Sequence, residues 1–187
     1  TLIRNRESQK TATVVISIIW TFSLLLPATI PVVKLPKPTG PFKVGTAIFH
    51  WTDTTRTEWF TEEPGDLRKM MIQLWYPANN NSQNKASPYI DHIDLRAQAI
   101  GDRVGLPSFM LDHLNLVKTH SFIEASPIES KELFPLIIFS HGLGGMRNQN
   151  TVLMEELASA GYAVVAMDHP YDANMTIFPP NGEASAE

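Results

Sequence analysis

The sequence predicts an α/β domain with a mostly parallel β-sheet, and three consecutive segments in its carboxyl half indicate this fold class. Residues 136–140 form a continuous apolar run, which is typical of a strand buried on both faces of a parallel sheet. Residues 152–160 have helical apolar spacing and end at Gly161, a residue type that often terminates helices. Residues 162–167 are again almost entirely apolar. A strand, a helix and a second strand in this order predict a β-α-β crossover.

The helix at residues 152–160 is expected to turn one particular face toward the sheet. Its predicted buried stripe consists of Val152, Leu153, Leu157 and Ala158. Its predicted solvent-facing side consists of Glu155, Glu156 and Ser159. Charged side chains normally face water, which favours this orientation.

The amino-terminal part of the chain contains a long uncharged segment at residues 11–33. As a helix, these 23 residues span about 34 Å, which is enough to cross a bilayer core of about 30 Å. They therefore predict a transmembrane or signal-anchor helix that precedes the folded domain. Basic residues lie on both sides of the segment, so they leave its orientation open. A cleaved signal peptide is the alternative, although no clear small-x-small cleavage site lies near Ala28.

A stiff linker is expected next, because residues 34–41 contain three prolines and a glycine. We predict that residues 1–38 form the membrane anchor and linker, and that residues 39–187 belong to the folded domain. We expect the domain to lie on the extracytoplasmic side of a membrane, with a secreted form as the alternative. Net charge is −4 and the basic residues are scattered, which argues against nucleic acid as a main partner.

Between the linker and the crossover, the sequence predicts an antiparallel leading edge of the sheet. Residues 44–51 and 70–76 have the alternation of strands, and residues 59–60 are predicted to form a short third strand between them. The polar residues 79–87 predict a loop. Weak helical periodicity over residues 91–116 predicts surface helices or an insertion over the sheet.

The residue types present exclude several kinds of site. The chain has no cysteine, so disulfides, thiolate nucleophiles and cysteine-type zinc sites are excluded. Its six histidines lack the paired spacing of metal-binding motifs. We therefore expect neither a metal nor another cofactor.

The candidate functional residues lie directly after the strand at residues 136–140. His141, Gly142, Leu143 and Gly144 form a glycine-rich loop at the strand end where α/β proteins usually place their chemistry. Such a loop can present backbone N–H groups to the negative oxygen that develops during acyl transfer. We expect the Leu143 N–H to be the donor of this oxyanion hole. Gly142 and Gly144 would permit the turn, and His141 would hold the loop rather than act as a base.

Two other interpretations of the loop remain open. Gly142 and Gly144 could begin a dinucleotide-binding turn, with Asp168 as the acid that binds the ribose. In that motif a third glycine would stand where this chain has Arg147, whose side chain opposes close helix packing. The glycines could also form a tight turn that binds no ligand.

Four stretches of the chain resemble the platelet-activating factor acetylhydrolase (isoform II) family of α/β hydrolases, including its bacterial members. These stretches are TGPFKVG at 39–45, MIQLWYP at 71–77, FPLIIFSHGLG at 134–144 and LASAGYAVVAMDH at 157–169. The resemblance implies the amino-terminal part of an α/β-hydrolase fold. It also implies a metal-independent serine hydrolase that cleaves short acyl chains from phospholipids, or small carboxylic esters. Leu143 then resembles an oxyanion donor of the family.

The catalytic triad that this resemblance implies is not in the chain. The family's nucleophile lies in a G-x-S-x-G motif, which is absent here. The nucleophile, acid and base are therefore expected beyond Glu187, and the 187-residue chain alone is expected to be inactive. The alternative is a non-catalytic, membrane-tethered α/β binding module.

Overall fold

The computed structural model divides the chain into two compact units, Thr1–Val33 and Lys34–Glu187. The structure describes residues 2–29, 32–79, 84–131, 133–178 and 183–185. The domain boundary expected at residue 38 remains a prediction.

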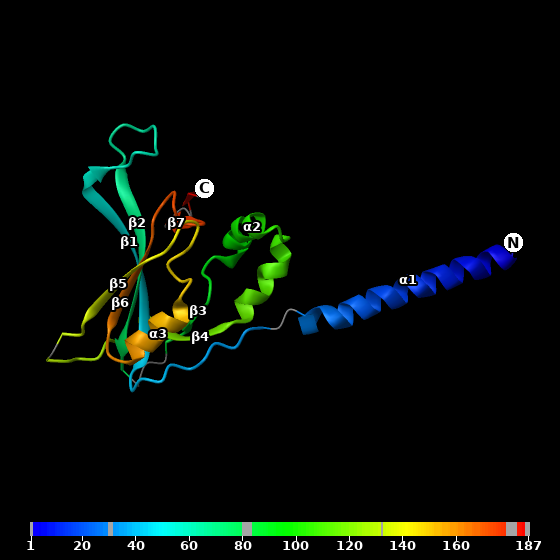
Figure 1. The fold of residues 1–187 in the computed structure, drawn as a ribbon, viewed down its shortest axis with the longest axis horizontal. Coiled ribbons are helices and arrows are strands. Elements are labelled where there is room, and N and C mark those ends of the chain that lie inside the picture. Colours follow the sequence, from blue (N-terminus) through cyan, green and yellow to red (C-terminus); the bar gives the residue numbers. More distant parts are fainter. Residues whose placement is uncertain (1, 30–31, 80–83, 132, 179–182, 186–187) are drawn as a thin grey trace. The chain divides into compact units, whose positions relative to one another are not determined.

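The first unit is a single helix, α1, at Leu2–Thr29 (Figure 1). Within the described part of the chain, no helix combines the length and the apolar character that crossing a membrane requires. The transmembrane segment predicted at residues 11–33 is therefore not confirmed. Residues 30 and 31 of that segment lie outside the described residues.

The second unit is built on a six-stranded sheet with the order β3-β4-β1-β2-β6-β5. Its strands are β1 Lys43–Thr57, β2 Leu67–Ala78, β3 Ala86–Pro88, β4 Lys118–Ile123, β5 Leu136–Ser140 and β6 Ala163–Asp168. The helical elements are α2 Ile93–Val104, the 3-10 helix η1 Ser108–Leu116 and α3 Thr151–Ser159. The short strands β7 Thr176–Phe178 and β8 Glu183–Ser185 pair in a separate hairpin. Figure 1 shows β1 and β2 as long neighbouring strands within the main sheet.

The sheet is mixed, so the prediction of a mostly parallel sheet is wrong. Strand β2 is antiparallel to β1 on one side and to β6 on the other, and β3 is antiparallel to β4. Only the pairs β1–β4 and β5–β6 are parallel among the described strands. The predicted crossover β5-α3-β6 and the antiparallel leading hairpin are both present. The mixture arises because the crossover joins this hairpin through β6, which lies between β2 and β5.

The predicted strand at residues 59–60 is also absent, and these residues form a bend instead. The Glu58 carboxylate accepts hydrogen bonds from the N–H groups of Trp59 and Phe60, at 2.8 and 3.3 Å. A side chain that binds nearby backbone in this way competes with strand pairing. The residues therefore turn the chain from β1 into β2.

The core of the second unit lies between the sheet and α3. Its buried members are Val44, Trp75, Met154, Ala158, Val164 and Ala166. Ile137 and Phe139 of β5 pack against this cluster, but Leu136 and Ile138 on the other face are 59% and 65% exposed. The prediction that β5 is buried on both faces is therefore wrong. Strand β5 lies at one edge of the sheet, and α3 covers only the face that carries Ile137 and Phe139.

The face that α3 turns to the sheet is only partly the one predicted, because Leu157 and Ala158 face the core and Val152 and Leu153 do not. Its buried side includes Met154, Glu155 and Ala158, whereas Val152 and Leu153 are largely exposed. Glu155 can be buried because its Oε1 accepts a hydrogen bond from the backbone N–H of His120 in β4, at 2.7 Å. A hydrogen-bonded carboxyl group thus occupies a core position that the sequence pattern assigned to solvent.

Burial raises the pKa of Glu155, while the Ser121 hydroxyl and the His120 N–H act in the opposite direction. The folded state therefore holds this proton more tightly than the unfolded state does. This group consequently lowers the free energy of unfolding as the pH rises from the ordinary value of 4.5 through the raised pKa. Glu155→Gln keeps the acceptor for His120 and never ionises, so we expect a smaller loss of stability over that interval. Urea unfolding of the variant and the original protein at a series of pH values measures this difference in the free energy of unfolding.

Glu156→Gln is the matched control for this prediction. Hydrogen bonds from Thr39 lower the pKa of Glu156, so its contribution to stability is present at neutral pH and is lost as the pH falls. The two adjacent substitutions should therefore change the pH dependence in opposite directions. A change of the same sign in both variants would contradict the assignment.

Candidate active site

The candidate site lies where β5 and β6 end. Because these strands are parallel, their carboxyl ends meet at one edge of the sheet and bring Ser140 next to His169. The Ser140 hydroxyl lies 2.8 Å from Nε2 of His169. Burial lowers the pKa of His169, and the charge of the neighbouring Arg68 lowers it further. A neutral His169 ring can accept the hydroxyl proton of Ser140 in this hydrogen bond.

Both ring nitrogens of His141 bind backbone groups of the site. Nε2 accepts a hydrogen bond from the backbone N–H of His169 at 3.1 Å, and Nδ1 lies 2.8 Å from the carbonyl oxygen of Gly142. One nitrogen therefore accepts and the other donates, which defines a neutral ring with its proton on Nδ1. The ring thus connects the end of β6 to the glycine-rich loop.

These contacts fix the orientation of the peptide between Gly142 and Leu143. The Gly142 carbonyl accepts hydrogen bonds from both the His141 ring and the Gly145 N–H, the latter at 2.8 Å. In a trans peptide the N–H points opposite to the carbonyl, so the Leu143 N–H is directed away from both donors. Among the described residues, no hydrogen bond uses this N–H. Its direction and its free state are what an oxyanion donor requires, and the role of Leu143 remains a prediction.

Gly144 needs the conformational freedom of glycine. Its φ is +68°, and its N–H donates to the carbonyl of Asp172 at 2.7 Å. A Cβ on Gly144 would also collide with the guanidinium of Arg103, which lies against the loop from the end of α2. The loop is therefore held from β6, from the segment after it and from α2.

We expect Gly144→Ala to lower the free energy of unfolding by about 1–2 kcal/mol, because alanine is strained at a left-handed φ. The collision with Arg103 adds to this cost, and moving Arg103 aside would relieve only that part. Chemical denaturation measures the change. Gly142→Ala is the control, because a Cβ there meets open space; its change should stay within about 0.5 kcal/mol. Equal stability of the two variants would contradict the assigned strain.

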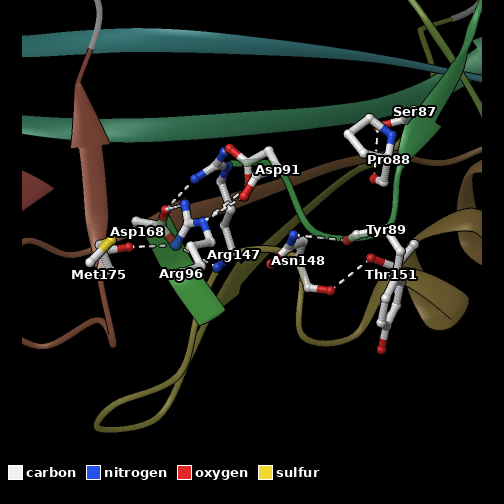
Figure 2. A network of polar contacts seen from close by, with 10 residues as sticks. All are labelled: Ser87, Pro88, Tyr89, Asp91, Arg96, Arg147, Asn148, Thr151, Asp168 and Met175. Carbon is white, nitrogen blue, oxygen red and sulfur yellow. Dashed lines mark hydrogen bonds and ion pairs between the residues drawn. The ribbon is translucent and has the colours of Figure 1, made fainter. Parts of the chain in front are cut away.

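A buried ion-pair network joins the end of β6 to Arg147 and to Arg96 of α2 (Figure 2). Asp168, at the end of β6, is fully buried and accepts hydrogen bonds from the backbone N–H of Arg147 at 2.6 Å and from its guanidinium. Arg96 of α2 lies 3.4 Å from the same carboxylate, and Asp91 pairs with both arginines. Asp168 is therefore occupied inside the protein and cannot reach a ribose. This geometry contradicts the dinucleotide interpretation of the loop.

Sequence reasoning missed this network, because its members are far apart in the chain. The available signal was Arg147, which stands where a nucleotide-binding turn would need glycine. Among the residues that the structure describes, no cluster of His, Asp and Glu is arranged to hold a metal ion.

Comparisons with known proteins agree on one family. The family model of platelet-activating factor acetylhydrolase, isoform II, matches residues 28–184. A platelet-activating factor acetylhydrolase of Cavia porcellus is 32% identical over 140 residues, which cover 72% of this chain and 28% of that protein. A probable 1-alkyl-2-acetylglycerophosphocholine esterase of Arthroderma benhamiae is 27% identical over 154 residues, which cover 77% of this chain and 39% of that protein.

A solved structure shares the fold. The ferulic acid esterase from Streptomyces cinnamoneus matches with a TM-score of 0.65 and 32% identity, over 83% of this chain and 41% of that chain. The chain thus spans well under half the length of these relatives. The family match covers most of the chain, including the loop at residues 141–145 and the ends of β5 and β6. The chain belongs to the platelet-activating factor acetylhydrolase, isoform II, family and has its α/β esterase-like fold.

Proposed function

We propose that this chain supplies the oxyanion-binding part of a carboxylic ester hydrolase. The observation that carries the proposal is the Leu143 N–H, which forms no hydrogen bond among the described residues and belongs to a peptide held by two donors. Its place at the carboxyl end of β5 is where α/β enzymes bind their substrates. The esterases among its relatives support the same reaction class.

In the proposed reaction, a serine hydroxyl attacks the ester carbonyl while a histidine accepts its proton and an aspartate orients that histidine. The carbonyl oxygen becomes negatively charged, and the Leu143 N–H donates a hydrogen bond to it. One such donor lowers the barrier by about 3–4 kcal/mol in well-studied cases. The alcohol then leaves with the proton, and water hydrolyses the acyl-enzyme. We place the serine, histidine and aspartate of the triad outside this chain.

The substrates that we propose are short acyl esters, either the acetyl ester of a phospholipid or a small carboxylic ester. The relatives include proteins named for both kinds of ester. In the proposed complex, the loop contacts only the carbonyl oxygen of the ester, and all these esters have that oxygen. The choice between them therefore depends on residues around the loop.

The test compares the complete product of the gene with the 187-residue chain, using p-nitrophenyl acetate and a serine-directed inhibitor such as phenylmethylsulfonyl fluoride. We expect inhibitor-sensitive turnover by the complete product and none by the chain alone. Absence of turnover by the complete product would reject the ester hydrolase. Inhibitor-sensitive turnover by the chain alone would show that the nucleophile lies within it and would reject the proposed division of the site.

A further inference from the structure

A cationic side chain lies directly beside the proposed oxyanion donor. Arg103 is in the last turn of α2, and its guanidinium packs on the backbone of Gly144. Its Nη2 lies 3.5 Å from the carbonyl oxygen of Leu143, which is a weak contact. The guanidinium thus reaches the loop next to the peptide whose N–H faces the substrate.

This guanidinium carries a charge without an acidic partner among the described residues. The buried Arg96 and Arg147 share Asp91 and Asp168, whereas none of the ion pairs in the described part of the chain includes Arg103. The adjacent Asp102 accepts a hydrogen bond from Gln98 instead, at 2.8 Å. Arg103 is also exposed, so its remaining N–H donors can meet a ligand.

We propose that Arg103 binds the phosphate group of a glycerophospholipid ester while the Leu143 N–H binds the carbonyl oxygen of that ester. This inference rests on the proposed function and specifies the substrate of the same site. The planar guanidinium matches phosphate oxygens with two parallel hydrogen bonds. In a glycerophospholipid, the ester and the phosphate are attached to adjacent glycerol carbons. One substrate can therefore contact two groups that are neighbours on the loop.

A binding experiment tests the inference without turnover. Glycerol phosphate is titrated into the protein while the Nε–H signals of the arginines are followed by NMR. We expect Arg103→Met to weaken binding about 10-fold, and Arg103→Lys, which keeps the charge, to weaken it less. Arg56→Met is the matched control, because Arg56 is an exposed arginine with its own partner, Asp53; it should leave binding unchanged.

Unchanged binding in both Arg103 variants would overturn the inference. Acetate serves as a second probe, and an equal affinity for acetate would overturn the assignment to phosphate in favour of a carboxylate. Arg103 is exposed, so its variants should fold, and circular dichroism verifies this. If the methionine variant does not fold, the weaker binding of glycerol phosphate expected for Arg103→Lys still tests the inference.

Turnover by the complete gene product gives the second measurement. We expect Arg103→Met to lower the kcat/KM for a phosphate-bearing acetyl ester, relative to that for p-nitrophenyl acetate, about 10-fold. An equal fall for both esters would show that Arg103 only supports the loop, and would overturn the inference. Phosphate binding that depends on Arg103, without turnover of either ester, would reject the proposed function and leave the phosphate site in place.

Discussion

Replacing Asp168 with Asn is expected to lower the free energy of unfolding by about 3–5 kcal/mol, the usual cost of removing one partner from a buried ion pair. Asp168 is fully buried, and it binds the guanidinium groups of Arg147 and Arg96 as well as a backbone N–H. Asparagine would leave two buried cations with Asp91 as their one remaining carboxylate in the network. Because domains of this size are stable by about 5–15 kcal/mol, urea denaturation should detect a large shift of the midpoint.

Asp112→Asn is the control for this prediction, since Asp112 is an exposed carboxylate in η1. Its free energy of unfolding should stay within about 0.5 kcal/mol of the original protein. An effect of Asp168→Asn that is equally small would show that the network does not stabilise the fold. If the Asp168 variant shows no cooperative unfolding transition, it is not stably folded, and this outcome also agrees with the prediction.

The same network predicts the direction of acid sensitivity. Burial alone would raise the pKa of Asp91, but the charges of Arg147 and Arg96 bring it below its ordinary value of 3.8. The contribution of this carboxylate is therefore present above that value and is lost as the pH falls through the lowered pKa. The contribution of Asp91 to stability therefore changes with pH in the opposite direction to that of Glu155, whose pKa is raised.

The parts of the fold that could be predicted from the sequence have strong local signals. Strand β5 was predicted with its observed bounds, because an apolar run is followed directly by turn residues. Helix α3 and strand β6 were predicted to within about one residue for the same reason. Strand β4 was missed, because its lysine, threonine, histidine and serine residues give little apolar alternation. Only its pairing with β1 and β3 makes it a strand.

The predictions of which side chains are buried failed where burial depends on residues that are distant in the sequence. Glu155 is buried because its carboxylate accepts a hydrogen bond from a backbone N–H of β4. No residue pattern within α3 indicates this hydrogen bond. Leu136 and Ile138 are exposed because no described element covers their face of β5, and the apolar run alone cannot indicate which face is covered.

The candidate site divides in the same way. The glycine-rich loop and the donor at Leu143 could be proposed from adjacent residues. The hydrogen bond from the His169 N–H to His141 joins residues that are 28 positions apart, and only the parallel pairing of β5 and β6 brings them together. Arg103 reaches the loop from α2, 40 positions away from Leu143. Its contribution could be recognised only once the helix had been placed.

Replacing His141 with Ala in the complete gene product is expected to lower kcat for ester hydrolysis about 100-fold or more, with little change in KM. The ring donates to the Gly142 carbonyl, and without it one of the two donors that orient the Gly142–Leu143 peptide is lost. Under the proposed function, a peptide that can rotate would no longer present the Leu143 N–H to the oxyanion. Loss of one oxyanion donor typically costs about 10²–10³ in kcat, because that interaction forms fully only in the transition state.

His141→Asn distinguishes this positioning role from a loss of packing. The asparagine amide can donate to a nearby backbone carbonyl as the imidazole does, so part of kcat should return. His113→Ala is the control, because that ring binds the Met110 carbonyl in η1 and not the loop. Thermal unfolding first establishes that each variant is folded. An unchanged kcat in folded His141→Ala would mean that the fixed peptide is not the oxyanion donor. A rise in KM alone would mean the same, because the variant would then have lost uniform binding of the substrate and not binding of the transition state.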